Sequence, residues 1–253
     1  MTLPSKTPVP LAAVFDLDGV ITDTASVHAA AWHTLFNDFL RSRGSSHRFD
    51  VGRDYPCYVD GRPRYEGVRN YLESVDITLP EGRDDELPGD GSVCALGNRK
   101  NEMFREALER DGITLFPAAV RFVKTLRSQG TPCALATSSR NGDFILAQTG
   151  LQELFQYRLD GTAAARLGLR GKPSPDVFRM CLDALGCLPK DSVLFEDAIA
   201  GVAAGRTGGF GLVVGVDRAD QADKLRQNGA DVVISSFEGL TLETMYEWMR
   251  LAK

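Results

Sequence analysis

The sequence lacks an excess of basic residues, a long hydrophobic run and paired cysteines. Its 253 residues include 29 Lys and Arg against 34 Asp and Glu, a formal net charge of −5. This balance argues against a nucleic-acid partner, because such partners usually bind a strongly basic surface. Residues 1–10 contain no apolar core of signal-peptide length, and no later apolar run approaches the length of a membrane span. We therefore expect a cytoplasmic monomer with no nucleic-acid or membrane partner.

Cysteine and histidine are too few and too scattered for a cross-linked or zinc-bound fold. The chain has three histidines and five cysteines, and no two cysteines form a C-x-x-C pair. We expect reduced, partly buried thiols at these positions, which are Cys57, Cys94, Cys133, Cys181 and Cys187. The 43% hydrophobic and 25% charged content is typical of a globular protein, long enough here for one full domain and an accessory one.

Short apolar runs alternate with helical patterns along most of the chain. The runs are rich in Val, Leu and Ile, as in parallel strands that are buried on both faces, and they cover residues 11–15, 132–136, 192–195, 212–216 and 231–234. Apolar residues at three- and four-residue spacing predict helices between them, over residues 118–128, 144–149 and 175–185. The alternation predicts an α/β fold with a Rossmann-like, doubly wound parallel sheet.

One stretch breaks the alternation. Residues 24–111 contain no convincing strand and predict several helices instead, over residues 24–40, 65–74 and 99–110. We interpret this stretch as an α-helical cap domain inserted after the first strand, so that residues 1–23 and 112–253 form the catalytic core. Inside it, residues 81–92 are rich in Gly, Pro, Asp and Glu and predict a surface loop, for which a solvated connector without chemistry is the simplest interpretation.

Two carboxylates close the first apolar strand, in the run Val-Phe-Asp-Leu-Asp-Gly-Val over residues 14–20. At strand spacing the side chains of Asp16 and Asp18 start on the same side of the chain. Ligand sites in open α/β sheets lie beyond the carboxyl ends of the strands. Such a pair can bind a hard divalent cation or act as nucleophile and proton carrier, although an Asp-Gly turn that leaves a strand explains it equally well.

Three further polar motifs stand at strand ends or helix starts. A Thr-Ser-Ser-Arg-Asn run over residues 137–141 offers hydroxyls and backbone N–H groups as a phosphate seat. Lys172 lies in a Gly-Lys-Pro-Ser-Pro-Asp turn, where Pro175 can start a helix. An acidic pair, Glu196 and Asp197, ends another strand. An N-cap, a surface lysine or a turn would explain each motif singly, but four in this order argue against coincidence.

Together the four motifs resemble the signature of the haloacid dehalogenase superfamily of phosphotransferases, over nearly the whole chain. The resemblance implies that Asp16 is the nucleophile that accepts the phosphoryl group and that Asp18 is the general acid and base. It further implies that Thr137 binds the transferring phosphate and that Lys172 steadies Asp16 and the phosphoryl oxygens.

The same resemblance implies a Mg²⁺ cofactor. Its implied ligands are Asp16, the backbone carbonyl of Asp18, and Asp197 with Glu196 nearby. The physical reasoning is consistent with this set, because an anionic nucleophile and an anionic phosphate repel each other unless a cation and an ammonium group neutralise both.

The first motif and the segment after it are similar to the β-phosphoglucomutase-like subfamily almost residue for residue, through residues 15–25 and then His28 and Trp32. Such enzymes interconvert β-D-glucose 1-phosphate and glucose 6-phosphate through glucose 1,6-bisphosphate. The resemblance implies that Thr24 and His28 help to place the general acid. Four residues apart on one helix, His28 and Trp32 could also simply pack together.

The subfamily's substrate-binding elements have counterparts in the predicted cap. A Gly-Arg-Pro-Arg run is similar to the loop whose arginine holds the phosphate that is not transferred. Arg64 is the best match for this arginine, and Arg62 would match it in an alternative alignment. In an Arg-Lys-Asn run, Lys100 matches the lysine that reaches the sugar. The other implied substrate contacts follow the second core strand and are Ser138, Ser139 and Asn141. The segment of residues 76–96 looks longer than in compact members, which leaves the sugar open.

Three classes of function remain. A mutase must shield the aspartyl phosphate from water, so it needs cap closure and a second phosphate grip, for which Arg64, Lys100 and Asn141 are candidates. A sugar-phosphate phosphatase shares every core residue and lets water attack instead. A non-catalytic binding module would have lost core residues that this chain retains. We favour the mutase. A nicotinamide dehydrogenase is excluded, because no G-x-G-x-x-G follows the first strand.

Overall fold

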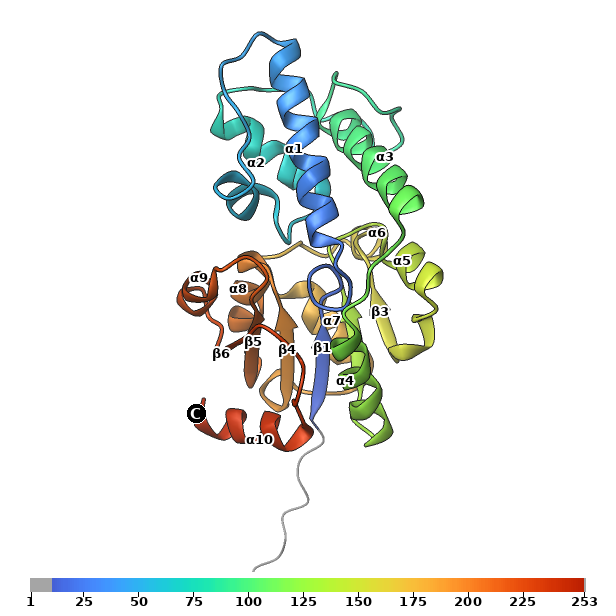
Figure 1. The fold of residues 1–253 in the computed structure, drawn as a ribbon, viewed down its shortest axis with the longest axis vertical. Helices are drawn as coiled ribbons and strands as arrows, with labels where there is room; N and C mark the ends of the chain where they lie inside the picture. The colour runs from blue at the N-terminus through green and yellow to red at the C-terminus, as the bar shows by residue number, and fades with distance from the viewer. Residues whose placement is uncertain (1–10, 253) are drawn as a thin grey trace, which may run out of the picture.

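The computed structural model describes residues 11–252, so the expectation for residues 1–10 lies outside the described part. A six-stranded, all-parallel sheet lies beneath a group of helices (Figure 1). The strand order is β3-β2-β1-β4-β5-β6. The strands are β1 (Ala12–Phe15), β2 (Cys133–Ala136), β3 (Tyr157–Leu159), β4 (Ser192–Glu196), β5 (Leu212–Val216) and β6 (Val232–Ile234). The predicted fold class is confirmed, as are all five predicted strands.

Strand β3 is the strand of the described sheet that the sequence did not predict. It has three residues at the edge of the sheet, and only Leu159 is buried among them. A short edge strand with one buried residue leaves no continuous apolar run in the sequence, so its hydrophobic pattern is too weak to identify.

The central strand β1 separates two apolar layers. Ala13 and Phe15 pack into one layer, and Ala12 and Val14 pack into the other, so all four residues are buried. Helices α4 (Pro117–Ser128), α5 (Gly142–Thr149) and α10 (Leu242–Leu251) contribute to the first layer. The second layer receives α6 (Gly161–Arg166), α7 (Asp176–Leu185), α8 (Ile199–Gly208) and α9 (Ala222–Gln227). Short 3₁₀ turns, η2 (Gln152–Leu154) and η3 (Pro189–Asp191), join these elements.

A separate helical layer covers the carboxyl edge of the sheet (Figure 1). It consists of α1 (Ala25–Ser42), a π-helical turn η1 (Tyr55–Val59), α2 (Arg64–Ser74) and α3 (Val93–Asp111). These elements share their own buried cluster, in which the rings of Phe36, Phe49 and Tyr71 pack within 5.1 Å of one another. We propose that residues 24–111, called the cap segment below, act as one domain on a core of residues 1–23 and 112–253.

Two boundaries in the cap segment differ from the sequence prediction. Helix α1 continues to Ser42, and α3 starts at Val93, six residues before the predicted start. The early start has a local cause, because Ser92 caps the helix: its Oγ accepts a hydrogen bond from the backbone N–H of Ala95 at 3.0 Å. The rest of the predicted loop, residues 81–91, contains no helix or strand.

The chain passes between core and cap segment twice, and the two passages run side by side. The backbone N–H of Asp23 donates to the carbonyl of Thr114, and that of Phe116 donates to the carbonyl of Ile21, both at 2.9 Å. Two adjacent crossings make a natural hinge for the cap segment.

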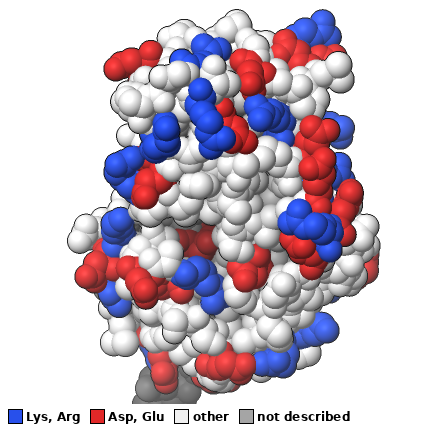
Figure 2. Space-filling model, turned by 45° about the horizontal axis from the view of Figure 1, so that its top comes forward, with Lys and Arg blue, Asp and Glu red and all other residues white. Residues whose placement is uncertain are grey.

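Surface charge and cysteine chemistry are unremarkable. Figure 2 shows acidic and basic side chains interspersed over one face, with no broad basic area on the part drawn in colour. All five cysteines are free; Cys57 is exposed, Cys187 is half-buried and the other three are buried. Between residues 11 and 252, no helix is both long and apolar enough to cross a bilayer.

Candidate active site

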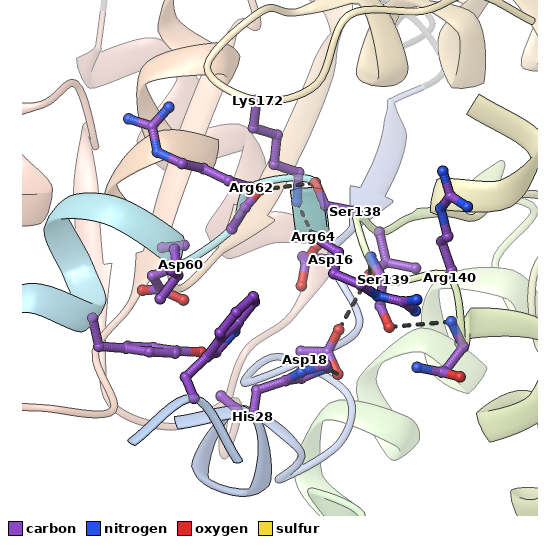
Figure 3. Close-up of a pocket in the computed structure, with 18 of the residues that line it drawn as sticks. Asp16, Asp18, His28, Asp60, Arg62, Arg64, Ser138, Ser139, Arg140 and Lys172 are labelled. Atoms are coloured by element: carbon purple, nitrogen blue, oxygen red, sulfur yellow. Dashed lines mark hydrogen bonds and ion pairs between the residues drawn. The ribbon is translucent and has the colours of Figure 1, made fainter. Parts of the chain in front are cut away.

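A pocket lies between the carboxyl edge of the sheet and the helices of the cap segment (Figure 3). Its core wall contains Asp16, Asp18, Thr137, Ser138, Ser139, Asn141, Lys172 and Asp197. The cap segment contributes the predicted residues His28, Arg64 and Lys100. The two remaining predicted residues, Thr24 and Glu196, are buried beside the pocket and contact residues of its wall. The cavity of about 70 Å³ has room for only a few water molecules, so a sugar phosphate requires the cap segment to move.

The pocket floor is an ammonium group between two carboxylates. Nζ of Lys172 lies 2.5 Å from Oδ1 of Asp16 and 2.5 Å from Oε1 of Glu196, and Lys172 is 0% exposed. Burial alone would lower the pKa of Lys172, but the two carboxylates raise it above its ordinary value. The lysine therefore stays charged and holds Asp16 in place.

The surroundings of Asp16 disfavour its negative charge, although Lys172 is in contact with it. Burial raises its pKa well above the ordinary value; Lys172 opposes this shift, while Glu196 and Asp18 add to it. A cation placed beside Asp16 would favour the ionised, nucleophilic form.

Asp18 is surrounded by groups that stabilise its charge. Oδ1 accepts a hydrogen bond from the Thr24 hydroxyl, Oδ2 accepts one from Thr137 at 3.2 Å, and Nε2 of His28 lies 3.4 Å from Oδ1. Figure 3 shows His28 beside Asp18. Burial would raise the pKa of Asp18, but His28 and the two hydroxyls outweigh it and lower the pKa to about 2. In this arrangement Asp18 is a carboxylate ready to accept a proton.

His28 connects Asp18 to other residues of the cap segment. Its ring stacks on Phe104 with centroids 3.9 Å apart, and its Nδ1 contacts Nζ of Lys100. Burial, and then the charge of Lys100, lower the pKa of His28 to about 4, although Asp18 opposes the shift. The stacking partner is therefore Phe104, which the sequence did not indicate, while Trp32 lies under Lys100, with Nζ 4.9 Å from its ring centroid.

The two candidate arginines have different partners. Arg64 is held within the cap segment: its Nη2 donates to Oδ1 of Asn101 at 2.7 Å, and Nδ2 of the core residue Asn141 donates to the same oxygen at 2.8 Å. Burial lowers the pKa of Arg64 to about 10. Arg62 also lines the pocket, but its Nη1 is paired with Oε1 of Glu66 at 2.9 Å. Of the two arginines, Arg64 is therefore the one whose hydrogen-bond acceptor, Asn101, is also bonded by a core residue, Asn141.

Three residues of the pocket wall were missed by sequence reasoning: Tyr55, Asp60 and Arg140. Asp60 directly precedes the Gly-Arg-Pro-Arg run, and Arg140 lies inside the phosphate-seat run, so position was the available signal for both. Nη2 of Arg140 pairs with Oδ2 of Asp84 at 2.8 Å. The loop of residues 81–91, predicted to be a plain connector, therefore contacts the core.

The donor set suits a hard cation such as Mg²⁺. Asp16, Asp197 and the carbonyl of Asp18 are all oxygen donors, which Mg²⁺ prefers. Among residues 11–252, no three Asp, Glu, His or Cys side chains enclose a metal site by themselves. Asp197 packs directly on the turn after Asp18: a Cβ on Gly19 would lie 1.8 Å from its Oδ2.

Glu196 is already fully engaged. Its Oε1 accepts from Lys172, and its Oε2 accepts from the backbone N–H of Ala198 at 2.7 Å. A Cβ on Gly201 would lie 1.8 Å from Oε1, so only glycine leaves room for this carboxylate. The geometry favours Glu196 as the partner of Lys172, and Asp197 as the carboxylate that faces the pocket.

An aspartate at the end of a central strand, a buried lysine and an acidic pair on the neighbouring strand define the class of protein. Residues 11–209 match the haloacid dehalogenase-like hydrolase family, and the chain belongs to this family. Among its relatives, a β-phosphoglucomutase of Mycobacterium tuberculosis is 42% identical over 237 residues, which cover 90% of each chain. A β-phosphoglucomutase of Bacillus subtilis is 30% identical over 237 residues, covering 93% of this chain and 94% of that one.

A solved structure agrees with the fold. The β-phosphoglucomutase of Clostridium difficile superposes with a TM-score of 0.76 at 23% identity, covering 96% of this chain and 98% of that one. The resemblance to the β-phosphoglucomutase-like subfamily that the motifs predicted is confirmed.

Proposed function

We propose that this protein is a β-phosphoglucomutase, which interconverts β-D-glucose 1-phosphate and glucose 6-phosphate by Mg²⁺-dependent phosphoryl transfer through an aspartyl phosphate on Asp16. The observation that carries the proposal is the arrangement of two grips on opposite walls of one pocket. Lys172 holds the nucleophile Asp16 on the core wall, and Arg64 lies on the cap wall within reach of the core residue Asn141.

The reaction begins with the phosphorylated form of Asp16. The C6 hydroxyl of β-D-glucose 1-phosphate attacks the phosphorus, Asp18 takes the hydroxyl proton, and the bond between phosphorus and the Asp16 oxygen breaks. The product is glucose 1,6-bisphosphate. Asp18 is ionised and can therefore take up this proton, and the low pKa that His28, Thr24 and Thr137 give it would make it a strong acid when the proton is returned.

The second half-reaction uses the same groups in reverse. The bisphosphate turns over, Asp16 attacks the phosphorus at C1, and Asp18 returns its proton to the leaving oxygen, which releases glucose 6-phosphate. Lys172 is positioned to hold the phosphoryl oxygens during both transfers, and the hydroxyls of Thr137 and Ser138, which here donate to Asp18 and to the Gly61 carbonyl, would turn to these oxygens when substrate binds. Arg64 and Asn141 are placed to hold the other phosphate.

Mg²⁺ would be held by Asp16, the carbonyl of Asp18 and Asp197, with Glu196 supporting Lys172. When bound, it neutralises charge between the attacking carboxylate and the phosphate. We expect EDTA to abolish activity and Mg²⁺ to restore it, with Ca²⁺ a poor substitute because its preferred geometry is looser. Full activity in EDTA would refute this part of the proposal.

Shielding from water separates the mutase from the alternative, a sugar-phosphate phosphatase of the same superfamily. The cap segment already contacts the core over the pocket, where the Ser138 hydroxyl donates to the carbonyl of Gly61 at 2.8 Å. A closed lid protects an aspartyl phosphate from hydrolysis. This closure supports the mutase.

The test measures two products from one reaction. The protein receives β-D-glucose 1-phosphate, Mg²⁺ and a trace of glucose 1,6-bisphosphate, and glucose 6-phosphate and inorganic phosphate are followed together. We expect isomerisation to exceed phosphate release by a wide margin, and the α anomer to serve as the matched negative control. If phosphate release equals or exceeds isomerisation, the phosphatase alternative replaces the mutase.

A further inference from the structure

Asp60 is a buried acidic residue for which the reaction described above has no use. It follows the π-helical turn η1 in the cap segment, is only 8% exposed and lines the pocket together with Asp16 and Asp197. Figure 3 shows it on the pocket wall, apart from the arginines. Anionic substrates make a buried carboxylate costly at this position unless a cation faces it.

The backbone after Asp60 is docked on the core beside the predicted metal ligand Asp197. A Cβ on Gly61 would lie 2.8 Å from Cβ of Ala198, the residue that follows Asp197, and 3.8 Å from the backbone nitrogen of Gly201. The Ser138 hydroxyl fixes the Gly61 carbonyl from the other side. Closure of the cap segment therefore brings the backbone at Asp60 beside the residues that follow Asp197, while Gly61 also contacts Ser138 of the phosphate-seat run.

The charges around Asp60 are mostly negative. After burial, Asp60 is the strongest cause of the raised pKa of Asp197, ahead of Glu196 and Asp16. Lys172, the buried cation of this region, is already shared by Asp16 and Glu196. Burial, and then Glu196, raise the pKa of Asp60 to about 7, although the Tyr55 hydroxyl and Lys172 oppose the shift. This closed arrangement brings together more carboxylates than one ammonium can neutralise.

We propose that Asp60 is the contribution of the cap segment to the cation site, where it holds water molecules of the Mg²⁺ bound by Asp16, the Asp18 carbonyl and Asp197. The inference rests on the proposed function. Mg²⁺ sheds its waters reluctantly and is usually bound through one or two carboxylates plus phosphate, so its remaining waters need acceptors. Carboxylates that accept from such waters raise metal affinity without direct coordination.

The arrangement links cation binding to closure. Without Mg²⁺, closure either leaves Asp60 charged beside Asp197 and Glu196 or makes it take up a proton, and both cost free energy, which favours the open form. With Mg²⁺, the same carboxylate is attracted and favours the closed form. The two effects are reciprocal: if Mg²⁺ raises the equilibrium constant for closure by a given factor, closure raises the affinity for Mg²⁺ by the same factor.

The test uses Asp60→Asn, a nearly isosteric change that removes the charge, and needs no turnover. Isothermal titration of the metal-free protein with Mg²⁺ gives the dissociation constant, and small-angle scattering in EDTA gives the radius of gyration. We expect Mg²⁺ binding to weaken by about tenfold, as for other residues that act on a metal through its ligands. In EDTA we expect the variant to be more compact than wild type, because the repulsion is gone.

Asp84→Asn is the matched control, since it also converts a cap carboxylate to an amide, but at the pocket rim where Asp84 pairs with Arg140. It should change Mg²⁺ affinity by no more than about twofold and make the protein in EDTA less compact, because it removes an attraction between cap segment and core. The opposite signs of the two scattering results separate a charge effect from general loosening.

Three outcomes would overturn the role of Asp60. Unchanged Mg²⁺ affinity in Asp60→Asn would do so, as would weaker binding together with a less compact metal-free form, which would indicate a structural role. Asp60→Ser, which keeps a hydrogen-bonding group, replaces Asp60→Asn if the latter does not fold. If wild type itself binds no Mg²⁺, the cation site of the proposed function fails, and the role of Asp60 with it.

Discussion

The core and the cap segment build their halves of the site by different means. In the core, site residues directly follow buried strands; all four residues of β1 are buried, and Lys172 is 0% exposed. In the cap segment, site residues stand on helices and are held by each other, as Arg64 is by Asn98 and Asn101. The core groups are therefore fixed before substrate arrives, whereas the positions of the cap groups relative to them depend on closure. We expect changes in the core to remove the chemistry and changes in the cap segment to alter recognition.

The largest effect is expected for Asp16→Asn. The change keeps the shape of the side chain but removes the nucleophile, so turnover should fall by at least about 10⁴-fold. Circular dichroism and thermal melting should still show a folded protein. Steady-state isomerisation is the measurement, and substantial remaining activity in the purified variant would contradict covalent catalysis at Asp16.

Arg64→Ala tests the cap half of the comparison. A charge-assisted grip on the second phosphate should be lost, so isomerisation should slow by about 100-fold, while hydrolysis of p-nitrophenyl phosphate, which has no second phosphate, should change by less than about threefold. Measured kcat/KM for both substrates gives the asymmetry. Equal losses in both reactions would contradict the grip and favour the phosphatase alternative.

Arg62→Ala is the matched control for Arg64→Ala. It removes a neighbouring guanidinium that is paired with Glu66, an interaction of modest free energy between partly exposed groups. We expect a smaller loss of isomerisation than in Arg64→Ala. The reverse ranking would assign the distal phosphate to Arg62, the competing register.

The core half of the site was predictable from sequence because three of its four motifs directly follow a hydrophobic strand, and the Lys172 motif directly precedes a helix, α7. Parallel strands end at one edge, so Asp16, Thr137 and Asp197 had to meet there. The cap half depends on how helices pack, which local pattern does not record. Asp60 and Arg140 were therefore missed, although each adjoins a recognised motif. Strand β3 was missed for a related reason: an edge strand of three residues carries too little apolar pattern.

A third effect should appear in stability as a function of pH, at the contact between the two halves. Burial, and then Lys100, hold the pKa of His28 at about 4 in the folded protein, against 6.5 for an ordinary histidine. Below pH 6.5 the unfolded chain takes up a proton that the folded chain refuses until about pH 4. The contribution of His28 to the free energy of unfolding should therefore fall as pH drops through this window, by at most about 3 kcal/mol, whereas Asp60, with a pKa raised to about 7, contributes with the opposite sign.

Urea unfolding at pH 7, 5.5 and 4.5 measures this effect, with His28→Gln and His33→Gln compared with wild type. His28→Gln should lose part of the pH dependence. His33 is exposed on the same helix, so its variant should keep the dependence. The depressed pKa of Asp18, about 2, costs stability only below the pKa of an unfolded aspartate, so its contribution falls outside most of the window. A dependence that survives in His28→Gln would show that another group causes it.

The smallest effect is expected at the rim of the pocket, where one exposed ion pair, between Asp84 and Arg140, joins the cap segment to the core. The Asp84 side chain is 63% exposed and that of Arg140 is 25% exposed, so the pair contributes at most about 1 kcal/mol to closure. Asp84→Asn should raise KM for isomerisation by no more than about fivefold, and high salt should reduce the difference from wild type because it screens exposed charges.

Asp85→Asn is the control, because Asp85 lies in the same loop but pairs with Arg83, 3.0 Å away within that loop. Asp85→Asn should match wild type at every salt concentration. If Asp84→Asn does so too, the rim pair has no part in closure, and the contacts of Gly61 and Asn101 with the core account for the closed form.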